Sequence, residues 1–467
     1  MIVMKFGGTS TQDSAAISNV VSIIRARLHK RPFIVISAIA KATNILENAG
    51  KLASEGQGDE ALRLLRGLID RHLSIIEGCT NEERRRTLLR DLIESSFCEL
   101  EALVGGVSIL RELTPRTLDA FYCYGEILSS RIVAAALQDG GVDAQWIDTN
   151  QFMVTDDNFT RALPLAESVE KRLTAIAEPL LQRGVVPVTQ GFIGVTTSGR
   201  RTTMGRESSD YSAAVIGAAL NADEIQIWTD VDGVLTADPR VVSSPMKVKQ
   251  LSFEEAYELS FFGAKVLHPN TMLPAIEKNI PIHVYNSRFP GGSGTSVAAK
   301  SAPPTPIVKS IAYKRNVVLL NVTPKARFGQ YVFWEHVYSI LTRHGAVSSL
   351  TCTSEYSIAI ALDAKNNIEA IVHELSSLGY VSVQEDRAIL CLVGSMLKDS
   401  RTLLTRFFNV VAGENVDMLS FGASASSISI IIDDERVLDA VKTLHEELFA
   451  SLPDNELFEL LEYAPAF

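Results

Sequence analysis

From the amino terminus to about residue 287, short runs of apolar residues alternate with stretches in which apolar residues recur at helical spacing. The runs predict buried strands at Met1–Phe6, Phe33–Ile36, Ala144–Ile147, Val185–Val188, Ile225–Trp228 and Ile282–Tyr285. The first helical stripe consists of Ile17, Val20, Val21, Ile24 and Leu28, and residues 44–138 are predicted to be mostly helical. Apolar strands separated by helices are typical of an α/β fold, in which helices cover both faces of a mostly parallel sheet.

The pattern changes beyond a segment rich in glycine, serine and proline, Pro290–Pro306, which predicts a linker. The next elements are Val317–Val322 (strand), Tyr331–Arg343 (helix), Ser348–Thr353 and Ser357–Leu362 (strands) and Asn367–Leu378 (helix). The same order recurs at Ala388–Val393, Arg401–Val411, Asp417–Phe421, Ser427–Ile432 and Glu435–Leu448. This is an internal βαββα repeat. Two such units side by side favour a small-molecule sensor, and a purely structural repeat is the alternative.

Bulk properties narrow the class of protein. The chain has 467 residues, enough for two or three domains, and 46% of them are hydrophobic. Its net charge of −11 argues against a general nucleic-acid binder. The five cysteines are scattered, which favours reduced thiols. Because no apolar run is long enough to span a membrane and Lys5 interrupts the start too early for a signal peptide, we expect a cytoplasmic protein without membrane contact.

The amino-terminal strand leads directly into Gly7, Gly8, Thr9 and Ser10, and a helix follows. Glycines let backbone N–H groups approach an anion closely, and a helix amino terminus adds positive potential. Lys5 would add a point charge beside bound phosphates. The lysine precedes the glycines, so this is not a P-loop. The motif taken alone predicts either a phosphate site or a plain βα turn.

Four further segments carry possible chemistry. Arginines, hydroxyls and Asp210 crowd before a helix in Gly199–Ala214, which favours an anion site over simple capping by Ser209 or Asp210. Asp230 or Asp232 could hold Mg²⁺ through water or stabilise a turn. Lys265 and Glu126, each taken alone, are better explained as solvated surface charges.

Together these segments resemble the aspartate kinases (aspartokinases) of the amino-acid kinase superfamily over essentially the whole chain. The resemblance rests on Lys5-Phe6-Gly7-Gly8-Thr9-Ser10, Gly125-Glu126, Thr189-Gln190-Gly191-Phe192, Gly205-Arg206, Ser209-Asp210-Tyr211, Trp228-Thr229-Asp230, Asp238-Pro239-Arg240 and Phe262-Gly263-Ala264-Lys265-Val266-Leu267-His268-Pro269. It implies a three-layer αβα catalytic domain over residues 1–290, a linker over 291–306, and two ferredoxin-like ACT domains over 307–386 and 387–454. In the family the second ACT unit is inserted into the first, so residues 455–467 are expected to complete the first unit. The pattern is nearest to the monofunctional, lysine-sensitive type.

The resemblance also implies the reaction and the residues that carry it. MgATP would phosphorylate the β-carboxylate of L-aspartate to 4-phospho-L-aspartate, the first step toward lysine (through diaminopimelate), threonine and methionine. Lys5 and Asp210 are the expected catalytic residues. The expected ATP contacts are Lys5, Gly7, Gly8, Thr229, Asp230, Leu235, Arg240, Lys265 and Val266. The expected aspartate contacts are Ser37, Thr43, Ser209, Arg206 on the α-carboxylate and Glu126 on the α-ammonium. No side chain is expected to bind a metal directly.

The regulatory half departs more from the family. The effector residues implied by the resemblance are Arg327, Gln330, Phe333, Trp334, Ser349, Ser354 and Glu355. Lysine-sensitive relatives have an aspartate in place of Ser349, so the effector could be lysine, threonine, another small molecule or none. In the catalytic half, Ser208 replaces a usual glycine and Leu235 an occasional tyrosine. ACT units commonly pair across subunits, which predicts a homodimer or larger assembly.

Two other functions are compatible with these features. Glutamate kinase is the nearest alternative enzyme, although it normally lacks a paired ACT tail. A catalytically silent amino-acid sensor is the alternative of another class. Retention of Lys5, Glu126, Arg206 and Asp210 argues against a sensor.

Overall fold

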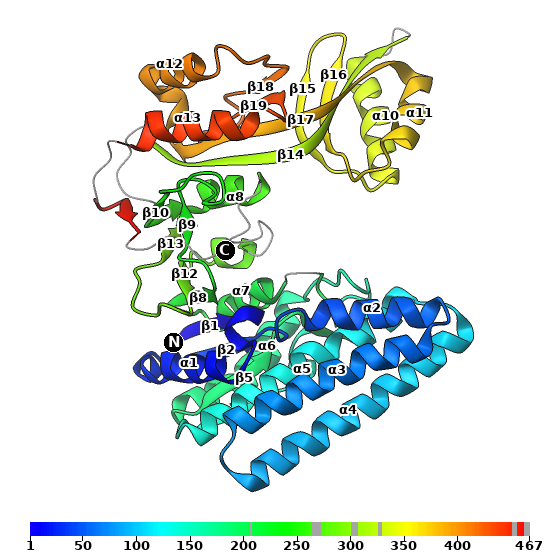
Figure 1. Cartoon of the computed structure of the whole chain (residues 1–467), viewed down its shortest axis with the longest axis vertical. Coiled ribbons are helices and arrows are strands. Elements are labelled where there is room, and N and C mark those ends of the chain that lie inside the picture. The colour runs from blue at the N-terminus through cyan, green and yellow to red at the C-terminus, as the bar shows by residue number, and fades with distance from the viewer. Residues whose placement is uncertain (206–207, 263–271, 300–306, 326–328, 451–454, 462–467) are drawn as a thin grey trace. The chain divides into compact units, whose positions relative to one another are not determined.

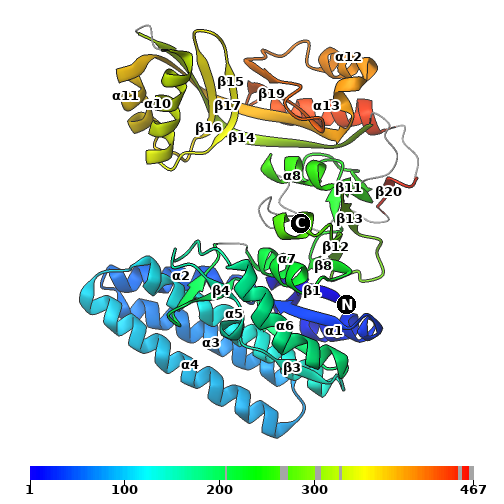
Figure 2. The ribbon, with the colours of Figure 1, turned by 180° about the vertical axis from the view of Figure 1, so that it is seen from behind.

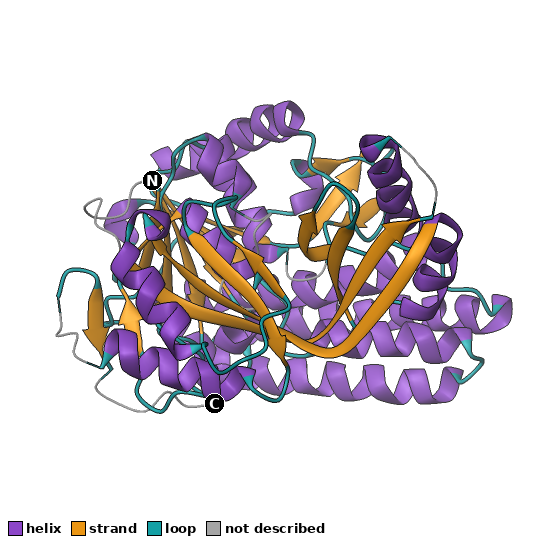
Figure 3. Cartoon of the chain, turned by 90° about the horizontal axis from the view of Figure 1, so that it is seen from above, coloured by secondary structure: helices purple, strands orange, loops and turns teal. Residues whose placement is uncertain are grey.

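The computed structural model describes residues 1–205, 208–262, 272–299, 307–325, 329–450 and 455–461. It divides into two compact units, each of which combines segments distant in sequence. The first unit comprises Met1–Gly233 and Asn270–Ala299, and the second comprises Val234–Pro269 and Lys300–Phe467. Strands are flanked by helices in both units (Figure 3). None of the helices in the described ranges is long and apolar enough to cross a membrane.

The first unit is built on a sheet with the strand order β13-β12-β8-β1-β2-β5-β3. These strands are β1 (Ile2–Phe6), β2 (Pro32–Ile36), β3 (Ala144–Trp146), β5 (Val186–Gln190), β8 (Glu224–Thr229), β12 (Ile282–Asn286) and β13 (Thr295–Ala298). All the pairs from β12 to β3 are parallel, as the apolar runs predicted. A second sheet of β4 (Val154–Thr155), β6 (Ile193–Thr196) and β7 (Arg201–Thr203) lies within the same unit.

The predicted linker is wrong in part. β13 lies inside residues 291–306, yet it pairs antiparallel with β12 from Ile282↔Val297 to Val284↔Thr295. Val297 is fully buried. The glycine-rich turn before β13 gives the segment a linker-like composition, but Thr295–Ala298 belong to the sheet.

Helices cover both faces of this sheet (Figures 1 and 2). The long helices α2 (Ala42–Ser54), α3 (Gly58–Cys79), α4 (Glu83–Leu110) and α5 (Pro115–Asp139) pack side by side, and α1 (Ser14–Arg25) lies against α3 and α5. α5 also contacts β2, β3 and β5. α6 (Ala166–Gln182) packs against β5, and α7 (Ser209–Ala219) against β1, β2 and β8. The unit also contains the short helix α9 (Leu273–Glu277).

The alternation of side chains along β1 determines where Lys5 points. Ile2, Met4 and Phe6 belong to the large buried cluster formed with α1–α5. Val3 and Lys5 therefore face the opposite side, where α7 packs. A strand interior is an unfavourable place for a lysine unless a charged partner faces it, and α7 supplies one at its first turn.

The second unit contains the predicted repeat. Its main sheet has the order β15-β16-β14-β17-β19-β18. The elements are β14 (Ile307–Pro324), α10 (Gln330–Arg343), β15 (Ser348–Thr353), β16 (Ile358–Asp363), α11 (Ile368–Leu378), β17 (Gly379–Ser395), α12 (Arg401–Val410), β18 (Met418–Ser420), β19 (Ser427–Asp433) and α13 (Val437–Phe449). The unit also holds β9 (Val234–Leu235), β10 (Met246–Val248), β11 (Gln250–Ser252), α8 (Phe253–Phe261) and β20 (Phe458–Leu460).

The two long strands β14 and β17 are shared between the two ACT units. They pair antiparallel along nearly their whole length, from Ile307↔Ser395 to Pro324↔Gly379. The carboxyl-terminal part of β14 also pairs with β16, and the carboxyl-terminal part of β17 also pairs with β19. The amino-terminal part of β14 thus takes the position of the last strand in the sheet of the second ACT unit, although it precedes the other strands of that unit in sequence.

This topology overturns the predicted insertion. The first ACT unit lies within the second, because β14 contributes to the second unit before the first unit begins. The segment expected to complete the first unit also lies elsewhere: Phe458–Leu460 forms β20, which pairs antiparallel with β10. Residues 462–467 lie outside the described residues.

Candidate active site

The turn after β1 brings backbone groups to the carboxyl edge of the sheet. Gly7 donates its N–H to the carbonyl of Trp228 at 3.0 Å. This N–H is therefore already engaged, which contradicts its predicted role as a phosphate donor. Gly8 begins the short 3₁₀ helix η1 (Gly8–Thr11), whose first N–H groups have no partner within the helix. A Cβ on Gly8 would lie 2.7 Å from the carbonyl oxygen of Ala38, so only glycine fits there.

Lys5 and Asp210 form an ion pair beside this turn. The Lys5 Nζ lies 2.6 Å from Asp210 Oδ1, and both side chains are mostly buried. A Cβ built on Gly7 would lie 3.7 Å from the Lys5 Nζ, which places the ammonium group against the glycine turn. Asp210 lies in the first turn of α7, where the helix dipole favours a carboxylate. The pair holds one cation in a fixed place next to backbone N–H groups that have no partner within η1.

Glu126 is a buried carboxylate in α5, and only 4% of it is exposed. Its Oε1 accepts a hydrogen bond from Ser209 Oγ at 2.7 Å, and its Oε2 has no partner within the described part of the chain. Burial raises the pKa of Glu126 to about 8, although Ser209, Ala38 and Lys5 act to lower it. A buried oxygen without a hydrogen-bond partner costs about 1–3 kcal/mol of stability. A ligand cation that pairs with Oε2 would remove this cost.

The loop after β2 joins the glycine turn to Glu126. Ser37 donates its N–H to the Phe6 carbonyl at 3.1 Å, and its own carbonyl accepts from Ser129 Oγ at 2.7 Å. A Cβ on Gly125 would lie 3.0 Å from the Ala38 Cβ and 3.9 Å from Thr43 Oγ1. The loop that carries Ser37 therefore lies between Glu126 and the glycine turn, and Thr43, in the first turn of α2, lies near Gly125. Their contacts with aspartate stay a prediction.

The predicted nucleotide residues divide between the two units. Thr229 ends β8 at the same sheet edge and Asp230 follows it; Thr229 Oγ1 donates to Asp230 Oδ1 at 3.3 Å. Leu235 and Arg240 belong to the second unit. Arg240 is exposed and pairs with Asp238 at 2.6 Å. The nucleotide contacts expected for Thr229, Asp230, Leu235 and Arg240 remain predictions. Arg206, Lys265 and Val266 lie outside the described residues.

Two buried polar residues escaped the sequence reasoning. Asp119 is fully buried in α5 and accepts from the N–H groups of Thr160 and Thr203 at 2.9 and 3.0 Å. It thereby fixes the chain just before segment 205–210. Gln190, at the end of β5, accepts from Thr149 with its side-chain oxygen, while its Nε2 has no partner among the described residues. The available signals were an aspartate two residues before the buried Phe121 in a helix and a glutamine at a strand end, which stood in the quoted Thr189-Gln190-Gly191-Phe192 segment without an assigned role.

The predicted effector residues have mixed surroundings. Phe333 packs in the core of the first ACT unit, with Trp334 against it. Gln330 donates to the Ser354 carbonyl at 3.2 Å, and Ser354 Oγ stabilises the turn to Ser357. Glu355 is exposed. Ser349 is buried and accepts from Lys314 Nζ at 2.9 Å. Arg327 lies outside the described residues.

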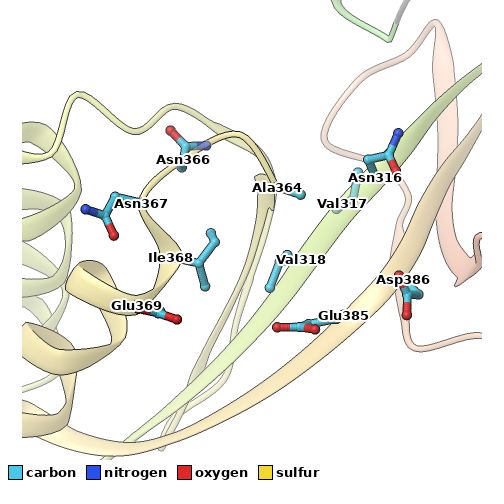
Figure 4. Close-up of a pocket in the computed structure, with 10 residues that line it drawn as sticks. All are labelled: Asn316, Val317, Val318, Ala364, Asn366, Asn367, Ile368, Glu369, Glu385 and Asp386. Atoms are coloured by element: carbon cyan, nitrogen blue, oxygen red, sulfur yellow. The ribbon is translucent and has the colours of Figure 1, made fainter.

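A hollow of about 410 Å³ lies elsewhere in the regulatory sheet, between β14, β17 and the start of α11 (Figure 4). Its lining includes Glu369, Glu385 and Asp386, and Figure 4 shows Glu369 and Glu385 pointing toward one another across it. Among the predicted effector residues that the structure describes, none lines this hollow.

Comparison with known proteins identifies the family. Residues 1–286 match the amino acid kinase family, and residues 390–448 match the ACT domain. The chain is 34% identical to lysine-sensitive aspartokinase 3 of Escherichia coli (strain K12), over 96% of this chain and 99% of that protein. The chain belongs to the aspartokinases. Aspartokinase 1, chloroplastic, of Arabidopsis thaliana is 36% identical over 98% of this chain and 81% of its own.

Solved aspartokinase structures share the fold. Escherichia coli aspartokinase III in complex with aspartate and ADP (R-state) has a TM-score of 0.84 at 34% identity, covering 96% of this chain and 100% of that one. The same enzyme in complex with lysine and aspartate (T-state) has a TM-score of 0.78 at 33% identity, covering 96% and 99%. The α/β catalytic fold and the carboxyl-terminal ACT region predicted from the sequence are thus confirmed.

Proposed function

We propose that this chain transfers the γ-phosphoryl group of ATP to the β-carboxylate of L-aspartate, giving 4-phospho-L-aspartate. The observation that carries the proposal is the meeting of two pairs, Lys5–Asp210 and Glu126–Ser209, at one glycine turn. A cation beside the backbone N–H groups that begin a 3₁₀ helix suits a transferring phosphoryl group. A buried carboxylate with an unpartnered oxygen suits an ammonium group.

Lys5 stabilises the charge on the transferring phosphoryl group. A carboxylate is already a nucleophile at neutral pH, so the reaction needs no general base. Catalysis then rests on alignment and on stabilisation of a loose transition state. Asp210 holds the Lys5 ammonium in place, and Gly8 offers its backbone N–H to phosphate oxygens. Magnesium enters with ATP, since Mg²⁺ usually binds through substrate phosphates and few carboxylates.

The amino-acid end of the substrate meets Glu126 and Arg206. Glu126 pairs with the α-ammonium through Oε2, the oxygen that Ser209 leaves free. Arg206 pairs with the α-carboxylate, because a guanidinium group binds a carboxylate in a bidentate manner. Ser37, on the loop that contacts both Gly8 and Gly125, and Thr43, in the first turn of α2, line the space between.

A hydroxamate assay tests the reaction. Incubation with MgATP, L-aspartate and hydroxylamine should trap the acyl phosphate as a coloured hydroxamate. The Lys5→Met variant should lose kcat by several orders of magnitude, whereas Lys30→Met should not, because Lys30 pairs with Glu224 away from the glycine turn. Hydroxamate formed with glutamate but not with aspartate would overturn the substrate assignment. A wild-type enzyme inactive with both would favour the sensor.

The ACT region carries feedback control in this proposal. The lysine complex of the related enzyme makes lysine the first effector to test, with threonine second. An effector coupled by about 1–3 kcal/mol would change the apparent aspartate affinity several-fold or more. Titrating each amino acid into the assay measures this, and light scattering tests for the homodimer or larger assembly that paired ACT units favour. The five free cysteines fit the cytoplasmic location that we propose.

A further inference from the structure

Arg71 reaches from α3 to two loops that meet at the active site. Its Nη1 donates to the carbonyl of Ala40 at 2.7 Å, and its Nη2 donates to the carbonyl of Gln12 at 3.0 Å. Gln12 ends the 3₁₀ helix that Gly8 begins, and Ala40 lies in the loop after β2. One guanidinium group therefore joins the glycine turn to the neighbouring loop. A planar guanidinium suits this task, because its donors are held in a fixed fork.

The two loops also contact each other directly. Ala40 donates its N–H to the Gly8 carbonyl at 3.0 Å, so both backbone groups of Ala40 are engaged, one with Gly8 and one with Arg71. The next residue, Lys41, has a φ of 68°, which is unfavourable for any residue other than glycine. Such a conformation persists only where neighbouring contacts hold it in place.

Arg71 is not one of the fully buried residues of its own helix. The buried face of α3 is apolar and consists of Ala61, Leu65, Leu68, Ile69, Ile75 and Ile76, together with His72. The partly buried Arg71 instead directs these two hydrogen bonds out of the helix, to backbone carbonyls of the two loops. The residue thus acts on the loops rather than on the helical layer.

We infer that Arg71 is a positioning residue, which locks the glycine turn and the loop after β2 into one rigid cradle for the reacting groups. The inference rests on the proposed function, since Gly8 serves the phosphates and Ser37 and Thr43 serve the amino acid. Removing the guanidinium leaves the direct backbone contacts, such as Ala40 to Gly8, as the remaining link, so the two loops are held less firmly relative to each other. The donors then lose their alignment with the transferring phosphoryl group while the fold survives.

The test compares Arg71→Ala and Arg71→Lys with the matched control Arg66→Ala. Arg66 lies in the same helix, where it contacts Glu94 and the Phe97 ring instead of the loops. Because a misplacement of about 1 Å costs up to ~10²-fold in rate, we expect kcat of Arg71→Ala to fall about ten- to hundredfold. Arg71→Lys should recover part of this loss, since an ammonium group still donates to one carbonyl. The control should stay within about twofold of wild type.

Hydrogen exchange separates positioning from a general loss of stability. In Arg71→Ala, amides of residues 8–12 and 37–43 should exchange faster, while those of β5 and α5 keep their wild-type rates. Unchanged kcat in Arg71→Ala would overturn the inference. So would a loss of activity that comes with faster exchange throughout the unit. If wild type itself forms no hydroxamate, the proposed reaction fails; local exchange changes would then still report the lock between the loops.

Discussion

Aspartate binding should release a proton from Glu126. Burial raises the pKa of this carboxyl group to about 8 in the free protein. At about pH 7 the group is then ~0.9 protonated, because the pH lies about one unit below its pKa. An α-ammonium group at Oε2 favours the charged carboxylate and returns its pKa toward the ordinary range. Binding at about pH 7 should therefore release ~0.9 of a proton per aspartate, and at about pH 9 only ~0.1.

The same linkage gives the aspartate affinity a steep pH dependence. Because only the ionised form of Glu126 pairs with the ligand, the apparent dissociation constant should rise about 50-fold from pH 8 to about pH 6. Isothermal titration calorimetry in buffers of different ionisation enthalpy measures both quantities. The Glu126→Gln variant is the control, because its amide cannot titrate: proton release should vanish and the affinity should no longer depend on pH. Proton release near zero in wild type at pH 7 would refute the reasoning.

Four further outcomes are expected. Gly8→Ala should destabilise the protein by about 1–3 kcal/mol and abolish activity, because the new Cβ would lie 2.7 Å from a carbonyl oxygen. Gly7→Ala, whose Cβ would meet nothing closer than 3.5 Å, should keep wild-type stability in urea unfolding. Lys309→Met should cost about 3–5 kcal/mol in the same assay, because it leaves the fully buried partner Glu255, 2.7 Å away, without a countercharge. Glu126→Gln should lose less stability than wild type as pH rises from about 4.5 to 8, since native Glu126 keeps a proton that the unfolded chain has released; parallel pH curves for the two proteins would contradict this.

Much of the catalytic fold could be predicted because its strands are buried on both faces. Such strands appear in sequence as continuous apolar runs, and β1, β2, β5, β8 and β12 all lie where these runs occur. β13 escaped prediction because its four residues become a strand only by pairing with β12. The local composition of residues 295–298 does not show that they pair with β12, because this pairing is determined by the tertiary structure.

The site was predictable in its charged parts and not in its supports. The sequence motifs contain charged and polar residues whose chemistry can be inferred from their type: Lys5, Glu126, Ser209 and Asp210. Arg71 does not, because it is one of several arginines on a helix that otherwise looks solvated. Its role appears only when the fold brings two loops to its guanidinium group.

Sharing β14 and β17 makes the two ACT units unequal as evolutionary and engineering modules. Val317 and Arg387 are cross-strand partners, so the chain enters and leaves the first ACT unit at neighbouring points. Removing residues 317–386 would leave two ends that a tight hairpin could rejoin. The parts of β14 and β17 that belong to the second ACT unit would stay intact. No single excision removes the second unit in this way, because its segments flank the first. A change that removes or replaces the first ACT unit is therefore the structurally simplest way to lose or exchange the response to an effector.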